Sequence, residues 1–257
     1  MISTLRSASF LAFLTVAPSL AFAQTPGRHV TDYAITLAGF TIATASFNTV
    51  LKETDYSVTG RFRTAGIAGL ITTISGETST EGQVSKGQLT SSEYRLVYRR
   101  GERSRIYDVK MRNGNVTSTT IDPPPRRSPE TWVAVRDADL RRVVDPLSGL
   151  MIPSSGKVCP TTLPVYDGET RMDIVLTDKG TKTIAIGKRR IDALVCGARY
   201  VPKAGFKRGR KDIEFLKAAA MEIWFAKSDV VDLYAPVYAR IPTKTGNLVI
   251  TATRFGK

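Results

Sequence analysis

The segment RSRIYDVKMRNGNVTSTTI, residues 103–121, carries the clearest structural signal in this sequence. β-Branched and aromatic residues recur in the runs 103–112 and 116–121, and these residue types are enriched in strands. Asn113-Gly114 separates the two runs, and an Asn-Gly pair in this position is the strongest short-range signal for a hairpin. The segment therefore predicts two antiparallel strands joined by a tight turn.

The same pattern extends over most of the chain in both directions. Turn signals separate the runs, and we interpret Thr245-Gly246-Asn247 and Asp178-Lys179-Gly180 as further hairpin turns. Many short strands with frequent turns predict a mainly-β fold, in which a curved antiparallel sheet forms an open or closed barrel-like structure. The other expected strands cover residues 33–47, 56–64, 88–99, 170–177, 181–186, 191–200, 219–226, 237–243 and 247–255.

Two segments depart from the strand pattern and predict one or two short covering helices. In residues 65–74 the apolar positions recur at the spacing of one helical face. In residues 145–151 an Asp-Pro pair supplies a cap and a first-turn proline, and Pro153 ends the segment. Both segments could instead be loops whose apolar side chains fill the core. The apolar positions are Ile67, Leu70, Ile71 and Ile74 in the first segment, and Leu147 and Leu150 in the second.

The N-terminus has the composition of a secretory signal peptide. Arg6 gives a positive start, an apolar run covers residues 8–21, and Ala21-Phe22-Ala23 has the small-x-small pattern of a cleavage site. We expect residues 1–23 to be removed and residues 24–257 to form a single β-rich domain in the periplasm of a Gram-negative bacterium. The proline-rich segment 122–129 is short and is interpreted as a stiff loop within that domain.

The charge of the chain favours anionic partners. The formal net charge is +14, and such a surplus attracts anions over the whole surface. Nucleic acid is not expected outside the cytoplasm, so the expected partners are anionic lipid head groups, lipopolysaccharide phosphates, acidic glycans or a lipidated envelope component. A solvated basic surface without a partner is the alternative.

The basic charge is densest between Lys203 and Lys211, where an aromatic residue, Phe206, lies among the cations. We interpret this segment as a long exposed hairpin loop that contacts an anionic membrane surface peripherally. A solvated turn is the competing interpretation. The cations are Lys203, Lys207, Arg208, Arg210 and Lys211.

The two cysteines, Cys159 and Cys196, are expected to form one structural disulfide. An isolated pair in an oxidising compartment usually does so, and the two residues lack the close C-x-x-C spacing of a redox pair. The bond would close a loop of about 37 residues, which is equivalent to about 3–4 kcal/mol in the chain-entropy model.

The residue inventory indicates no catalytic, metal or cofactor site. The one histidine, His29, lies near the predicted cleavage site, where chain ends are usually poorly ordered. Histidine-dependent triads and zinc motifs are therefore not expected, and no nucleotide-binding loop is recognisable. Asp167 and Glu169 could serve glycan hydrolysis as a carboxylate pair, but a polar turn at Asp167-Gly168 is the stronger interpretation.

Several short runs, spread over nearly the whole mature chain, resemble the motifs of one family. They are VDPLSGL (144–150), CPTTLPVYDG (159–168) with the alternating residues 171–176, Tyr200, IWF (223–225) with Asp229, and Pro236-Val237. Together they resemble the exported Gram-negative family of domain of unknown function thirty-one hundred and eight. More loosely, the pattern is similar to the open β-half-barrels of the outer-membrane lipoprotein chaperones. The resemblance implies a half-barrel fold and supplies no catalytic residues.

These observations predict a non-enzymatic envelope protein that binds an apolar or amphipathic ligand, such as a lipid or a lipoprotein acyl chain, inside a barrel-like sheet. A structural protein that docks a protein partner without a ligand pocket is the alternative, and a glycan hydrolase is a weaker one. The expected ligand-binding residues are Ile67, Leu70, Ile71, Ile74, Leu147 and Leu150.

Overall fold

The computed structural model describes residues 27–85 and 88–256, apart from the side chains of Ile67, Leu70 and Ile71. The predicted signal peptide lies outside the described residues. The strands are β1 (Gly27–Leu37), β2 (Phe40–Leu51), β3 (Asp55–Thr64), β4 (Ile74–Ser85), β5 (Gln88–Arg100), β6 (Arg103–Arg112), β7 (Asn115–Asp122), β8 (Trp132–Val133), β9 (Ile152–Pro153), β10 (Thr161–Tyr166), β11 (Arg171–Ile186), β12 (Arg189–Ala204), β13 (Phe206–Lys207), β14 (Met221–Lys227), β15 (Leu233–Thr243) and β16 (Gly246–Gly256). The α-helices are α1 (Gly66–Ile71) and α2 (Lys211–Ala218), and the 3₁₀ turns are η1 (Asp137–Leu140) and η2 (Ser148–Leu150).

One large antiparallel sheet contains 14 of these strands. Its path runs β10-β11-β12-β14-β15-β16-β1-β2-β3-β4-β5-β6-β7, with β9 paired beside β15, and β13 and β8 form a separate pair. In the described part of the chain, the end strands β10 and β7 do not pair with each other, so the sheet stays open. The predicted mainly-β fold, with a curved, barrel-like sheet and short helices, is confirmed. Of the two predicted alternatives, open or closed, the structure shows the open sheet.

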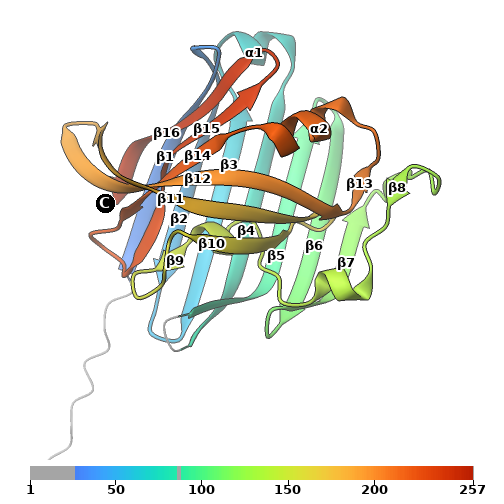
Figure 1. Cartoon of the computed structure of the whole chain (residues 1–257), viewed down its shortest axis with the longest axis horizontal. Coiled ribbons are helices and arrows are strands. Elements are labelled where there is room, and N and C mark those ends of the chain that lie inside the picture. The colour runs from blue at the N-terminus through green and yellow to red at the C-terminus, as the bar shows by residue number, and fades with distance from the viewer. Residues whose placement is uncertain (1–26, 86–87, 257) are drawn as a thin grey trace, which may run out of the picture.

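The sheet folds over on itself around the main core. In Figure 1 the long strands β11 and β12 cross in front of β2 to β5. The largest buried cluster joins the two layers, because Tyr56 and Val58 of β3 belong to it together with Ala193 of β12 and Val237 of β15. The face of β1 to β6 that carries Val58 is called the inner face below, and the opposite face is called the outer face.

Aromatic rings lie over glycines on the inner face. The Phe47 ring covers Gly60, and the Phe62 ring covers Gly76, so a Cβ at either glycine would collide with the ring. Glycines in strands commonly mark such close approaches. The missing Cβ atoms allow the large aromatic side chains to lie close against the neighbouring strands.

The hairpin predicted from residues 103–121 is confirmed. β6 and β7 are joined by Asn113 and Gly114, whose φ angles of 51° and 73° suit a tight hairpin turn. The single strand expected over residues 33–47 is wrong, because Ala38 and Gly39 form a second turn with φ angles of 49° and 88°. Alanine seldom adopts this conformation, which is why the sequence hid the turn.

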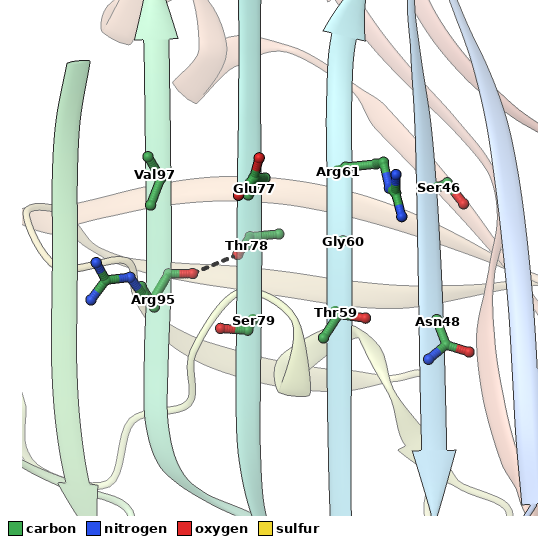
Figure 2. Close-up of a pocket in the computed structure, with 10 residues that line it drawn as sticks. All are labelled: Ser46, Asn48, Thr59, Gly60, Arg61, Glu77, Thr78, Ser79, Arg95 and Val97. Atoms are coloured by element: carbon green, nitrogen blue, oxygen red, sulfur yellow. Dashed lines mark hydrogen bonds between the residues drawn. The ribbon is translucent and has the colours of Figure 1, made fainter.

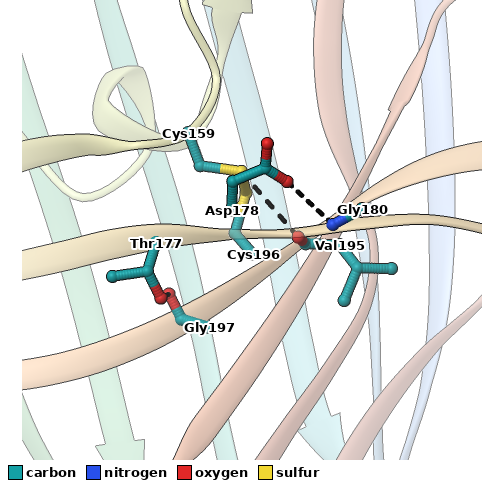
Figure 3. The surroundings of a disulfide bond; sticks show 7 residues. All are labelled: Cys159, Thr177, Asp178, Gly180, Val195, Cys196 and Gly197. Atoms are coloured by element: carbon teal, nitrogen blue, oxygen red, sulfur yellow. Dashed lines mark hydrogen bonds between the residues drawn. A yellow bond between two sulfur atoms is a disulfide. The ribbon is translucent and has the colours of Figure 1, made fainter.

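The hairpin turn expected at residues 178–180 is also wrong. These residues form a bulge within the continuous strand β11, where the pairing with β12 shifts register. Asp178 Oδ1 accepts a hydrogen bond from the Gly180 backbone N–H at 2.7 Å, as Figure 3 shows. The turn lies further on, between β11 and β12, at Gly187 with φ 58°. Glycine at positive φ suits a bulge as well as a turn, so local sequence did not separate the two.

The structure joins Cys159 to Cys196, with their Cα atoms 6.1 Å apart (Figure 3). Cys196 is fully buried in β12, and Cys159 precedes β10. Around the bond, Phe225, Leu176 and Val158 form a second buried cluster on the other side of β12 and β14. The disulfide thus fastens the segment before β10 against the outside of the folded-over layer.

Candidate functional site

The outer face of β2 to β5 carries a polar hollow of about 480 Å³ (Figure 2). Two of its charged side chains pair with neighbours outside the lining: Arg95 pairs with Asp108 at 2.7 Å, and Glu77 pairs with Arg99 at 3.4 Å. Exposed pairs of this kind contribute little to stability and leave little net charge for a ligand. This face therefore has the character of an ordinary solvated sheet surface.

The inner face has a different composition beyond the main core. Tyr33 and Phe47 are half-buried, pack against the main cluster and meet edge to face, with ring centroids 5.9 Å apart. Phe62 and Tyr98 follow in the same cross-strand row as Tyr33, through the pairs with Ala45 and Gly76. Both are half-buried, and neither belongs to a described core cluster. The inner face therefore offers aromatic surface beyond the packed core.

Helix α1 connects β3 to β4 next to this aromatic surface and contacts β2. The expected helix over residues 67–74 is confirmed for residues 66–71 and is shorter than expected, because β4 begins at Ile74. Ile74 is half-buried. The side chains of Ile67, Leu70 and Ile71 lie outside the described residues, so their ligand-binding role stays a prediction.

The segment 145–151 packs into the core of the folded-over sheet. Asp145 is fully buried, and its Oδ1 accepts hydrogen bonds from the backbone N–H groups of Leu147 and Ser148 at 2.9 and 3.0 Å. Its Oδ2 accepts from Thr80 at 3.1 Å, and Tyr56 meets Ser148 at 2.7 Å. Asp145 thus caps the turn at residues 145–148, as the Asp-Pro pair predicted, but the expected helix is reduced to the 3₁₀ turn Ser148–Leu150. The segment plugs the open sheet.

The two expected ligand contacts in the plug are separated by the structure. Leu147 packs against the main cluster and against the cluster around Tyr94 and Val109, whereas Leu150 packs against the cluster around Phe225. The ligand-binding role of Leu147 and Leu150 also stays a prediction. The two side chains pack against different clusters, so they do not form one continuous surface.

The expectation that His29 lies in a poorly ordered end is wrong. Residue 29 belongs to β1, which pairs with β2 and β16, and its side chain is 2% exposed. Its Nδ1 lies 2.8 Å from Ser228 Oγ, and its Nε2 lies 2.8 Å from Thr31 Oγ1. Burial lowers its pKa to about 4, against a smaller opposite effect of Asp229. His29 is therefore a neutral core residue, held by two hydroxyl groups.

The two carboxylates of the predicted pair, Asp167 and Glu169, make different contacts. Asp167 Oδ1 accepts from the backbone N–H groups of Glu169 and Thr170 at 2.9 and 2.6 Å, which makes residues 167–170 a polar turn. Burial raises the pKa of Asp167, and these hydrogen bonds oppose that shift. Glu169 instead pairs with Arg127 at 3.3 Å and accepts from the Tyr107 hydroxyl at 3.3 Å. The turn interpretation of Asp167-Gly168 therefore fits the observed contacts.

Glu169 also lines a second hollow, of about 860 Å³, at the β6–β7 edge of the sheet. Burial raises the pKa of Tyr107, so its hydroxyl stays a donor to Glu169. Arg127 stacks over the Trp132 ring, with its guanidinium carbon 4.9 Å from the ring centroid. We call this site the arginine hollow; its lining consists of Arg105, Pro123, Pro124, Pro125, Arg126, Arg127, Trp132 and Glu169.

The sequence offered a partial signal for the arginine hollow. The run PPPRR at 123–127, followed by Trp132, has the right residue types for a stiff cationic site with an aromatic wall, but it was interpreted only as a stiff loop. Arg105 and Glu169 come from β6 and from the turn after β10, so their presence depends on the fold.

The interpretation of residues 203–211 as one exposed hairpin loop is wrong. Lys203 lies in β12 and pairs with Asp173 at 3.2 Å. Phe206 is half-buried and, with Lys207, pairs with Val133 and Trp132 of β8. Lys211 begins helix α2, whose first turn carries acidic residues. Pairing with β8, which the sequence did not predict, replaces the loop and sets this basic segment beside the arginine hollow.

The exposed cations of that segment divide into two groups. Arg210 pairs with Asp212. Lys207 and Arg208 are exposed next to β8, and the Arg208 backbone N–H donates to Thr131 O at 2.8 Å. The contact of this segment with an anionic surface stays a prediction.

Within residues 27–85 and 88–256, no helix is long and apolar enough to cross a membrane. Over the same ranges, no group of three or more His, Cys, Asp or Glu side chains is arranged to hold a metal ion.

Fold and hollows together define a class of protein: a mainly-β protein built on one open antiparallel sheet, folded over an internal plug. The chain belongs to the family described as "Protein of unknown function (DUF3108)", whose profile matches residues 32–253. The family resemblance inferred from the short motifs is therefore confirmed.

Further comparisons concern curated proteins and solved structures. No curated protein matches the chain. A crystal structure described as a beta-barrel-like protein of domain of unknown function DUF1849 from Brucella abortus is 10% identical, with a TM-score of 0.48. The match covers 90% of this chain and 97% of that chain.

Proposed function

We propose that the protein is a non-enzymatic periplasmic binding protein that holds an apolar or amphipathic ligand, such as a lipid, against the inner face of its open sheet. The observation that carries the proposal is the half-buried aromatic surface beyond the packed core. Phe62 and Tyr98 extend the row that begins at Tyr33, and no described core cluster covers them.

An apolar ligand would be stabilised here by the removal of aromatic surface from water. Large aromatic side chains gain about 25 cal/mol for each Å² removed from water, so half-buried rings next to one another are favourable contacts for an apolar ligand. The opposite end of the sheet is already filled by the plug with Asp145, Ser148 and Leu147. A ligand would therefore occupy the half of the inner face near α1.

Periplasmic location is part of the proposal. It is supported by the signal-like N-terminus and by the disulfide between Cys159 and Cys196, since structural disulfides persist in oxidising compartments. No catalytic family is indicated by the comparisons. The non-enzymatic character is proposed because Asp167 is engaged by the backbone of its own turn, while Glu169 is engaged by Arg127 and Tyr107.

The first test is native mass spectrometry of the mature protein purified from its own periplasm, followed by lipid extraction. We expect a reproducible mass excess that matches an extracted lipid. Tyr98→Ser should reduce the bound fraction several-fold, because it removes the aromatic ring at the end of the row, outside the described core clusters. Phe40→Ser is the matched control, because Phe40 is 65% exposed at the start of β2.

Two results would contradict the proposal. A clean apoprotein mass from several independent preparations would favour the alternative, a structural protein that docks a partner. Equal loss of lipid in the Tyr98→Ser and Phe40→Ser variants would show that the inner face is not where the lipid binds.

A further inference from the structure

We infer that the arginine hollow is a binding site for a phosphate group carried on an organic, partly apolar molecule. The site is assembled from three separate parts of the chain. Arg105 comes from β6, Arg126 and Arg127 come from the loop after β7, and Glu169 comes from the turn before β11. β8 supplies Trp132.

The balance of charge in the hollow favours an anion. Three arginines line it against one acidic side chain, Glu169. Glu169 is already engaged, because it pairs with Arg127 and accepts from Tyr107. Arg105 and Arg126 therefore present positive charge that no acidic residue of the lining neutralises. Guanidinium groups suit phosphate, because their planar donors can bind two oxygens at once.

Arg105 supplies an independent observation that points to a ligand. Its Nε is buried and has no hydrogen-bond partner among the described residues. A buried donor without a partner is costly, and such groups in native proteins commonly mark a site for an ion, water or ligand. A phosphate oxygen bound at the Arg105 guanidinium would satisfy this donor once a small shift of the side chain uncovers Nε.

The walls of the hollow suit the organic part of the ligand. Pro123, Pro124 and Pro125 form a stiff apolar wall, and the Trp132 ring faces the Arg127 guanidinium. The volume of about 860 Å³ is far larger than a single phosphate ion needs, since one water takes up about 30 Å³ in the liquid. The hollow therefore has room for a phosphate ester with part of its organic body.

The neighbouring segment raises the local positive potential. The pairing of β13 with β8 sets Lys207 opposite Trp132, and Arg208 follows it on the exposed side. Neither residue lines the hollow. They would attract an anion toward it at low salt, and this attraction should weaken as salt screens it.

This inference rests on the proposed function, because it names the group that the bound amphipathic molecule presents. The phosphate could come from a lipid head group or from a small soluble ester. Two probes separate these sources: glycerol 3-phosphate, and monomeric dihexanoylphosphatidic acid, which adds two short acyl chains. Glycerol 3-phosphate carries no acyl chain, so it tests the hollow independently of the inner face.

The experiment is isothermal titration calorimetry of each probe into the mature protein and into single arginine variants. Arg105→Gln should weaken binding at least about tenfold, because it removes the buried donor and one charge. Arg126→Gln, which changes an exposed side chain and is not expected to affect folding, should weaken it several-fold. Arg112→Gln is the matched control: it makes the same charge change at an exposed position of β6, at the other end of the strand from Arg105.

The outcomes are distinct. Tighter binding of the lipid probe than of glycerol 3-phosphate assigns the site to a lipid head group, and equal binding assigns it to a soluble phosphate ester. No saturable binding of either probe overturns the inference, as does an equal effect of Arg105→Gln and Arg112→Gln. If a neutral lipid co-purifies and neither probe binds, the proposed function stands and this inference fails. If glycerol 3-phosphate binds and no lipid co-purifies, this inference stands and the proposed function fails.

Discussion

Acidification should destabilise this protein through its one histidine. His29 is 2% exposed, and both ring nitrogens lie 2.8 Å from hydroxyl groups, so protonation would place a charge in a buried site. Its pKa is lowered to about 4 in the folded protein, whereas an unfolded histidine has a pKa of about 6.5. Between these values the unfolded chain binds more protons, so stability is lost as pH falls from 6.5 towards 4.

The size of the effect follows from the two pKa values. Relative to pH 7.5, linkage predicts a loss of about 2 kcal/mol in the free energy of unfolding at pH 5 and about 3 kcal/mol at pH 4. Because the sequence contains one histidine, no other imidazole contributes in this window. The remaining change comes from carboxyl groups, which a matched variant shares.

The assay is urea unfolding at pH 7.5 and pH 5, followed by tryptophan fluorescence, for the natural sequence and for His29→Gln. The variant should be less stable at pH 7.5, because its side chain fills the site less well, but it should lose about 2 kcal/mol less on going to pH 5. NMR titration of the single imidazole gives the folded-state pKa directly. An equal pH dependence of the two proteins, or a folded-state imidazole that titrates near pH 6.5, would refute the reasoning.

Three further predictions concern the plug, one glycine and the basic segment. Asp145→Ala should lower the free energy of unfolding by about 3 kcal/mol, because it leaves two backbone donors unsatisfied, whereas Thr80 can still donate to the Glu93 carbonyl. Asp145→Asn keeps an acceptor oxygen and should cost clearly less in the same chemical denaturation assay. Gly205→Ala should lower the midpoint of thermal unfolding far more than Gly101→Ala. Both glycines have positive φ, but a Cβ at Gly205 would collide with the Glu169 carbonyl, whereas nothing lies within 4 Å of a Cβ at Gly101. Similar midpoints for the two variants would contradict the observed packing. Binding to anionic vesicles should weaken with added salt and with charge reversal at Lys207 and Arg208, measured by vesicle co-sedimentation, and binding that neither change affects would remove the basic segment as the contact.

Much of the secondary structure could be predicted because strand and turn signals are local. Asn113 and Gly114 made the β6–β7 hairpin visible, since the residues that adopt the turn are the residues that favour it. The predicted strands and turns were wrong where the same local residues are compatible with two backbone structures, or where a residue adopts an uncommon one. Gly180 supports a bulge as well as a turn, and Ala38 adopts a conformation that alanine seldom takes.

The candidate sites were less accessible to sequence reasoning, because they depend on contacts between distant segments. His29 was assigned to a loose end of the chain, but pairing of β1 with β2 and β16 buries it. The basic segment was assigned to a loop, but pairing of β13 with β8 places Lys207 beside Trp132. The pairing of β13 with β8 has no local signature, since each of these strands contains only two residues.

The sequence by itself determined the mainly-β class, the cap at Asp145 and the motifs of the family, because the two-residue period, turn chemistry and short motifs are properties of neighbouring residues. Only the tertiary structure decided that the sheet stays open, that residues 145–151 plug it, and that Arg105 meets Arg126 and Glu169 in one hollow. These features depend on which strands pair and on how far the sheet bends. Such choices are set by packing across the whole core, not by any one stretch of the chain.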